Sequence, residues 1–322
     1  MTQTPTPHAI QAIRLIRVGL HVVQGVIIAG IVLRFAREPL RSRIIQNWSQ
    51  KLLAIFGVDY QVLGAMPDLS TRGAVFVANH VSWLDIWLIY ALRPVRFISK
   101  ADVRGWPVVG WLAEKTGTLF IERERRQHTA AIIKEAEAAL AQGDCIGLFP
   151  EGTTTDGLRL LPFHASLFQA AVAQQAPIVL IAIRYRLADG GVDTAPAYYG
   201  DLSLADSLRA VLARRRIRVE ARYLGTLISA GKTRRELSRA AENAIATALN
   251  LPAPHKTPEI PGGLQDAAPS AVRPTRSPCR VPRCVPTTSG RAPTSGRTRS
   301  TPNPASADTR PCNRGAARRR ST

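Results

Sequence analysis

The chain has 322 residues and a formal net charge of +20, with 43 lysines and arginines against 23 aspartates and glutamates. This length can bury a sizeable core, and the charge favours anionic partners such as nucleic acid, acidic phospholipid or phosphate-bearing molecules. Only Cys145 precedes residue 250, inside an apolar stretch, which excludes a disulfide framework or a cysteine metal site there and predicts a small core residue.

The composition changes sharply near residue 250. Residues 252–322 hold 13 of the 23 prolines and 13 lysines and arginines against 3 acidic residues. Such a segment buries too little apolar surface to offset the entropy of ordering it, so we expect a disordered tail. The sequence therefore predicts three parts: an N-terminal membrane-associated helix (1–38), a central domain (39–250) and the tail (251–322).

An apolar run of 16 residues, 18–33, lies near the N-terminus. At 1.5 Å per residue it spans about 24 Å, somewhat less than the roughly 30 Å of a bilayer core, so it predicts a marginal or tilted membrane helix. A cleaved signal peptide and a buried amphipathic helix are the alternatives. Four arginines follow the run and two precede it, which by the positive-inside rule places the remaining chain on the cytoplasmic side of the inner membrane.

Strand-like and helix-like segments alternate through the central part. Apolar and β-branched runs predict strands at 58–63, 74–78, 95–99, 118–122, 145–149, 178–185 and 217–223. Helical periodicity predicts helices at 39–56, 83–92, 108–115, 129–141, 163–172, 203–213 and 233–249. This alternation indicates an α/β fold, in which functional residues gather at the strand ends.

The stretch Asn-His-Val-Ser-Trp-Leu-Asp, 79–85, follows the predicted strand 74–78 directly. His80 is a candidate proton acceptor, and Asp85 could orient its imidazole. Five residues along one helix separate two side chains by about 140°, so the pair can meet only if His80 lies in the turn before the helix and Asp85 in its first turn. The structural alternative is a loop histidine beside a capping box formed by Ser82 and Asp85.

Two further strand ends carry polar residues. Arg123 comes just after the strand 118–122, where a guanidinium suits a phosphate or carboxylate, although a solvated surface charge is the simpler alternative. The strand 145–149 is followed by Pro-Glu-Gly-Thr, in which the glycine lets backbone N–H groups approach an anion. An ordinary turn is the alternative there.

Together with 177–181, a proline followed by an apolar strand, these stretches resemble the four ordered motifs of the lysophospholipid acyltransferases, which include the 1-acylglycerol-3-phosphate acyltransferases. They are N-H-x-x-x-x-D at 79–85, G-x-x-x-I-x-R at 117–123, F-P-E-G-T at 149–153 and the stretch at 177–181. The resemblance covers about residues 40–250 and implies a mixed sheet covered by helices.

The resemblance implies an acyltransferase that moves a fatty acyl group from acyl-CoA or acyl carrier protein to the free hydroxyl of a lysolipid at a membrane. His80 would be the general base and Asp85 its orienting partner, with no metal and no cofactor beyond the acyl donor. The substrate-binding residues would be Lys100, Arg123, Glu151, Gly152 and Thr153. The chain has no G-x-S-x-G elbow, so no covalent enzyme intermediate is expected.

Two departures bear on the acceptor. Members that acylate a phosphate-headed lysolipid commonly carry arginine after E-G-T, where this chain has Thr154, and Leu180 stands where a second proline is frequent. The stretch F-P-E-G-T-T-x-D-G followed by L-L-P-F-H is similar to the branch that acylates lyso-ornithine lipid, so both acceptors stay open. A thioesterase using the same site and a membrane-anchored nucleic-acid-binding protein are the alternative functions, although no nucleic-acid motif is present and no specific nucleic acid is expected.

Overall fold

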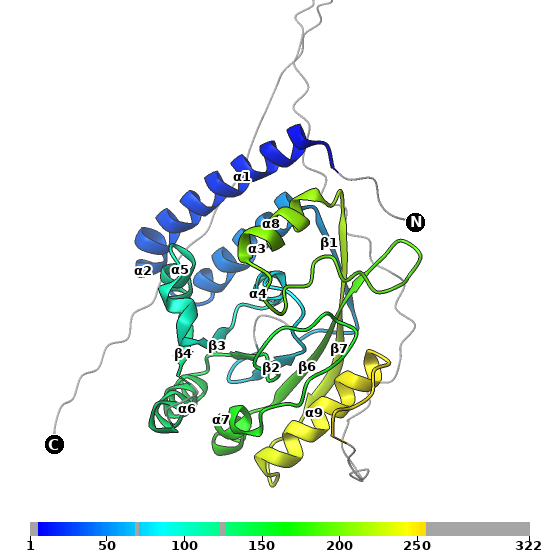
Figure 1. Ribbon diagram of the computed structural model, residues 1–322. Helices are drawn as coiled ribbons and strands as arrows, with labels where there is room; N and C mark the ends of the chain where they lie inside the picture. The colour runs from blue at the N-terminus through cyan, green and yellow to red at the C-terminus, as the bar shows by residue number, and fades with distance from the viewer. Residues whose placement is uncertain (1–5, 68–70, 123–125, 256–322) are drawn as a thin grey trace, which may run out of the picture. The chain divides into compact units, whose positions relative to one another are not determined.

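Seven strands form one sheet in the computed structural model, which describes residues 6–67, 71–122 and 126–255 (Figure 1). The strand order across the sheet is β1-β7-β6-β2-β5-β3-β4. Their bounds are β1 Val58–Leu63, β2 Val75–Ala78, β3 Arg96–Lys100, β4 Leu119–Ile121, β5 Ile146–Leu148, β6 Ile178–Arg186 and β7 Ile217–Leu227. All seven predicted strands are present, each within a few residues of its expected bounds.

The sheet is mixed, as the resemblance implied. Strands β2 to β6 run in the same direction, β7 pairs antiparallel with β6, and β1 pairs parallel with β7. At the centre, β2 lies between β5 and β6, and all four of its residues are buried. A strand covered on both faces needs a continuous apolar sequence, which explains its Val-Phe-Val-Ala. The residue after β2 therefore emerges at the middle of the carboxyl edge.

Helices cover both faces of the sheet (Figure 1). On one face lie α1 His8–Ile27, α3 Leu40–Phe56, α4 Leu84–Leu92, α5 Val109–Lys115 and α8 Leu204–Ala213. On the other lie α6 Arg126–Ala141, α7 Gln169–Ala173 and α9 Arg234–Ala248. The predicted helix 163–172 is a 3₁₀ turn, Ala165–Phe168, that leads into the short α7.

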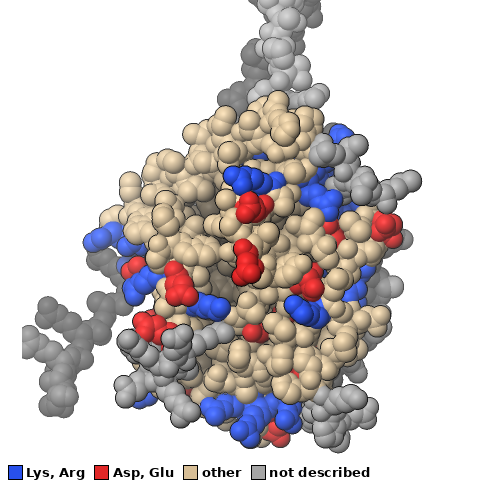
Figure 2. Space-filling model, viewed as in Figure 1, with Lys and Arg blue, Asp and Glu red and all other residues tan. Residues whose placement is uncertain are grey.

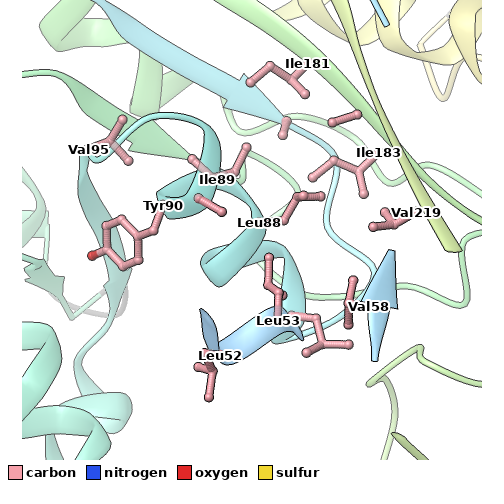
Figure 3. Close-up of a cluster of buried hydrophobic side chains, with 14 of the residues drawn as sticks. Leu52, Leu53, Val58, Leu88, Ile89, Tyr90, Val95, Ile181, Ile183 and Val219 are labelled. Atoms are coloured by element: carbon pink, nitrogen blue, oxygen red, sulfur yellow. The ribbon is translucent and has the colours of Figure 1, made fainter. Parts of the chain in front are cut away.

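The core under α3 and α4 fixes where the first strand-end motif lies (Figure 3). Leu53 of α3 and Leu88 of α4 are at most 1% exposed and pack toward the sheet. Ile183 of β6 and Val219 of β7 supply the facing side chains. Truncating a buried leucine of this kind to alanine costs about 2–5 kcal/mol, so α4 is held firmly on the strands that flank its N-terminus.

The N-terminal helix is longer than the predicted run. It extends without a break from α1 through a π-helical segment, Ile28–Val32, into α2, Leu33–Phe35. By length and composition this span of 28 residues, whose most apolar 18-residue window has a mean hydropathy of 2.0, could cross a membrane. Only 17% of its most apolar window is buried.

One side of this helix is fastened to the rest of the protein along most of its length. The Arg14 guanidinium donates to the carbonyl oxygens of Arg214 and Arg215, just past α8, at 2.6 and 2.9 Å. Farther along, the His21 ring stacks on Trp48 of α3 with centroids 4.6 Å apart, and the two residues exchange side-chain to backbone hydrogen bonds. These contacts hold α1 flat against α3 and α8.

The opposite side of the same helix is apolar and open. Every third or fourth residue exposes between 54% and 77% of its surface, a spacing that places these side chains on one face: Ile13, Ile16, Leu20, Val23, Ile27, Ile31 and Phe35. In Figure 2 the surface along α1 is almost free of charged residues, which lie mainly on the middle and lower parts of that view.

Candidate active site

His80 and Asp85 meet at the carboxyl end of β2. The imidazole Nδ1 of His80 lies 3.0 Å from the Asp85 carboxylate oxygen Oδ2. His80 lies in the turn before α4, Asp85 lies in the first turn of that helix, and Asp85 is fully buried. This is the arrangement that helix geometry required. With Nδ1 donating to the carboxylate, Nε2 is the basic nitrogen, and it has no hydrogen-bond partner among the residues that the structure describes.

The same carboxylate oxygen also organises the turn. Asp85 Oδ2 accepts the backbone N–H groups of Val81 at 2.7 Å and Ser82 at 2.8 Å. The Ser82 hydroxyl accepts the Leu84 N–H at 3.3 Å. The capping interpretation and the catalytic interpretation are therefore not exclusive, because one oxygen serves the helix start and the imidazole together.

Aromatic stacking fixes the plane of the imidazole. The His80 ring lies on Phe149 with centroids 3.9 Å apart and planes 8° apart, and Phe149 in turn stacks on Phe97 of β3. The His80 side chain is 15% exposed, and it lines a cavity rather than packing into the core. A ring held on one face and at Nδ1 can present Nε2 in one direction only.

The Glu151 carboxylate lies behind this loop. Its two oxygens accept the backbone N–H groups of His80 at 2.8 Å and Leu161 at 2.9 Å, and the residue is 3% exposed. Burial raises the pKa of Glu151 to about 7. Sequence reasoning proposed Glu151 as a substrate ligand, whereas the structure places its carboxylate on the backbone that carries His80.

The other predicted binding residues lie in different settings. Gly152, with φ of 74°, and the exposed Thr153 border the same cavity as His80, and so does the exposed Lys100 at the end of β3. The Gly152 N–H donates to the carbonyl of Phe149 at 3.0 Å. Arg123 lies outside the described residues.

The cavity in front of His80 is apolar and has a volume of about 440 Å³. It runs between the N-terminal helix and the helices α3, α4 and α5, and its walls include Ile28, Trp48, Leu52, Trp87 and Leu112. This size and lining suit a small molecule with a long apolar part. Within the ranges that the structure describes, no group of three or more histidine, cysteine or acidic side chains could hold a metal ion.

Tyr185 is a site residue that sequence reasoning did not identify. Its hydroxyl donates to Asp85 Oδ1 at 2.7 Å, and its ring is 2% exposed. In sequence it is one aromatic residue in a buried strand, which normally indicates core packing. Only the pairing of β6 with β2, in which Ile181 lies opposite Ala78, brings it level with the loop after β2.

Comparison with known proteins agrees with this site. The acyltransferase family model matches residues 61–184, a range that includes His80, Asp85 and Glu151. A lyso-ornithine lipid O-acyltransferase of Pseudomonas aeruginosa is 40% identical over 211 residues, which cover 66% of this chain and 80% of that protein. The chain belongs to the acyltransferase family. The resemblance inferred from the four motifs is thereby confirmed.

A second relative and a solved structure are also acyltransferases. A 1-acyl-sn-glycerol-3-phosphate acyltransferase of Neisseria meningitidis serogroup B is 33% identical over 184 residues, 57% of this chain and 71% of that protein. The crystal structure of the 1-acyl-sn-glycerophosphate acyltransferase PlsC from Thermotoga maritima superposes with a TM-score of 0.53 at 21% identity, over 74% of this chain and 96% of that one. The acyltransferase fold predicted here is therefore correct.

Proposed function

We propose that this acyltransferase moves a fatty acyl group from a thioester donor, acyl-CoA or acyl carrier protein, to the free hydroxyl of a lysolipid. One observation carries the proposal: an imidazole held at Nδ1 by buried Asp85 lines an apolar cavity of about 440 Å³. The base suits a hydroxyl acceptor, and the cavity suits an acyl chain.

In the proposed reaction, His80 Nε2 removes the proton of the lysolipid hydroxyl as its oxygen attacks the thioester carbonyl carbon. A C–O bond forms, the carbonyl carbon becomes tetrahedral, and Asp85 stabilises the imidazolium. When the intermediate collapses, the C–S bond breaks and His80 returns the proton to the thiolate. The products are an ester and a free thiol, so no cofactor and no covalent enzyme intermediate are needed.

The oxyanion of that intermediate requires a hydrogen-bond donor. The N–H groups of Val81, Ser82 and Gly152 are committed to protein acceptors. In the part of the chain that the structure describes, the N–H of Thr153 has no protein partner, and Thr153 borders the cavity. We assign this N–H as the oxyanion donor. Lys100 and Arg123 remain proposed ligands of the polar parts of the substrates.

For the acceptor we favour a zwitterionic lysolipid of the lyso-ornithine type over a phosphate-headed one. The relative of Pseudomonas aeruginosa named for that acceptor is 40% identical, against 33% for the relative named for 1-acylglycerol-3-phosphate. Thr154 borders the cavity and donates its hydroxyl to the carbonyl of Tyr198, so this position supplies no cation for a phosphate.

We propose that the protein works on the inner membrane from the cytoplasmic side, with the N-terminal helix lying in the membrane surface. The arginine and histidine contacts that fasten one side of α1 would be lost if the helix left the domain to span a bilayer. Its exposed apolar face can instead enter the lipid while the domain stays in water. The cavity behind α1 would then open beside its lipid substrates.

Labelling tests this placement. With the tail cysteines 279, 284 and 312 replaced by serine, a cysteine introduced at His8 should react with a membrane-impermeant maleimide in inside-out vesicles only. Reaction in intact spheroplasts would show that the helix crosses the membrane.

The function itself is tested with purified protein in lipid nanodiscs. Acyl-CoA and acyl carrier protein are supplied in turn with lyso-ornithine lipid or 1-acylglycerol-3-phosphate, and both thiol release and lipid products are measured. The proposal expects a diacylated lipid in equal amount to the thiol. Thiol release with free fatty acid as the product, and no acylated lipid, would identify a thioesterase instead. Salt-sensitive DNA binding by residues 1–251 without acyl transfer would favour the nucleic-acid alternative.

A further inference from the structure

Tyr185 reaches the site from the strand beside β2. Along β6 the side chains alternate, so that Ile181, Ile183 and Tyr185 belong to the core under α4, and Leu180 and Ala182 belong to the core on the other face. The last of the first set carries a hydroxyl, which donates to Asp85 Oδ1 at 2.7 Å. A fully buried polar contact across two elements is costly to lose, because the oxygen left behind has no water to replace the donor.

The two oxygens of Asp85 have different partners. Oδ2 accepts three donors, the Nδ1 of His80 and the backbone N–H groups of Val81 and Ser82. In the described part of the molecule, Oδ1 has a single donor, the hydroxyl of Tyr185. The χ2 torsion of Asp85 is therefore fixed at Oδ2 by the loop after β2 and at Oδ1 by the hydroxyl of Tyr185.

We propose that Tyr185 is a positioning residue for acyl transfer, which holds the Asp85 carboxylate in the rotation and charge distribution that orient His80. This proposal depends on the proposed role of His80 as general base. Tyr185 does not touch the cavity, and it acts on the reaction only through Asp85.

The hydroxyl should affect the basicity of the site as well as its geometry. A donor on Oδ1 draws negative charge away from Oδ2, so it moderates the stabilisation that Asp85 gives to a protonated imidazole. Removing the donor should therefore keep the base protonated up to a higher pH. Among the residues that the structure describes, Glu151 accepts the His80 backbone N–H, and the ionisable side chains that border the cavity with His80 are Lys100, Tyr90 and Tyr198.

Tyr185 does not itself transfer a proton in this scheme. Burial, followed by the charge of Asp85 and their hydrogen bond, raises the pKa of Tyr185 well above its ordinary value. The phenol thus keeps its proton while the substrate proton moves to Nε2 of His80 and on to the thiolate.

The test is Tyr185→Phe, which removes one oxygen and keeps the buried ring. We expect kcat to fall about tenfold with little change in KM for the donor, and the acidic limb of the pH–rate profile to move up by about 0.5 pH unit. The matched control is Tyr223→Phe, which removes a tyrosine hydroxyl bonded to Thr226 at 2.9 Å on the neighbouring strand, and which should leave both quantities unchanged. A Tyr185→Phe enzyme with kcat within twofold of wild type and an unshifted profile would overturn the proposal.

A readout without turnover separates this proposal from the proposed function. The titration of His80 is followed by NMR in protein labelled with ¹⁵N-histidine, and its signal is assigned by its loss in His80→Ala. An upward shift of the midpoint in Tyr185→Phe, and a downward shift when fluorotyrosine at 185 provides a stronger donor, support the positioning role even if no lysolipid is acylated. Identical titrations in all three proteins would refute it. A wild-type enzyme that acylates no lysolipid would refute the proposed function alone.

Discussion

The Glu151 carboxylate accepts the backbone N–H of His80 at 2.8 Å, and the Asp85 carboxylate lies 3.0 Å from the imidazole Nδ1 of the same residue. Two buried acids from different strand ends thus hold one histidine, one by its main chain and one by its ring. The Thr155 N–H adds a third constraint, since it donates to the His80 carbonyl at 2.9 Å. A loop held in this way needs little rearrangement to present the same nitrogen at each turnover.

Glu151 should make the stability of the protein fall as the pH rises. Burial raises its pKa from an ordinary value of 4.5 to about 7. A group whose pKa is raised by folding contributes stability that is complete below the unfolded value and is lost as the pH rises through the folded one. Since a tenfold change in proton affinity is worth about 1.4 kcal/mol, the loss between pH 4.5 and pH 8 is about 3 kcal/mol.

Urea denaturation checks this prediction at several pH values in that range. Glu151→Gln removes the titration and should lack this part of the pH dependence. Glu114→Gln, at a carboxylate whose side chain is 52% exposed, should follow wild type. Parallel curves for wild type and Glu151→Gln would contradict the assignment.

Gly25 should tolerate no side chain, although alanine is normally the better helix residue. A Cβ at Gly25 would lie 2.8 Å from the Trp48 ring, which is packed between His21 and Trp87, so Gly25→Ala must displace that ring from the cavity wall. We expect Gly25→Ala to lower the free energy of unfolding by about 1–3 kcal/mol. Nothing lies within 4 Å of a Cβ at Gly19, and Gly19→Ala should instead stabilise the protein by about 0.5–1 kcal/mol. The melting temperatures of both variants are compared with that of wild type. Equal shifts for Gly25→Ala and Gly19→Ala would refute the packing argument.

Thr154 should influence the acceptor. Thr154→Arg places a guanidinium at the cavity, where it can pair with a phosphate headgroup. We expect the ratio of kcat/KM for 1-acylglycerol-3-phosphate over lyso-ornithine lipid to rise about tenfold. Thr154→Ser, which keeps the hydroxyl on the Tyr198 carbonyl, should leave the ratio unchanged. If the ratio stays constant in Thr154→Arg, the headgroup binds elsewhere.

Local sequence patterns were sufficient to predict the elements. The seven strands and the helices between them follow from apolar periodicity, and helix geometry set the condition under which His80 and Asp85 can meet. The N-terminal helix was placed at 18–33 because two arginines interrupt the apolar pattern before it. In the structure the helix begins at His8, directly after Pro7, and Arg14 within it binds the carbonyl oxygens beyond α8.

Contacts between distant residues could not be predicted in the same way. Glu151 was proposed as a substrate ligand because its motif ends a strand, yet its role depends on a contact with a residue 71 positions earlier. Tyr185 lies 100 positions after Asp85, and no local pattern distinguishes it from a core tyrosine. The positions of β5 and β6 on either side of β2 decide both contacts.

The central claim is that His80 is the general base for acyl transfer to a lysolipid. The most direct measurement is lysolipid-dependent thiol release from acyl-CoA by His80→Ala, compared with wild type and with His8→Ala, a histidine at the start of α1. The account predicts that His80→Ala loses at least about 100-fold in kcat while its circular dichroism spectrum and thermal unfolding stay close to wild type, and that His8→Ala keeps full activity. Turnover by folded His80→Ala within a few-fold of wild type would contradict it.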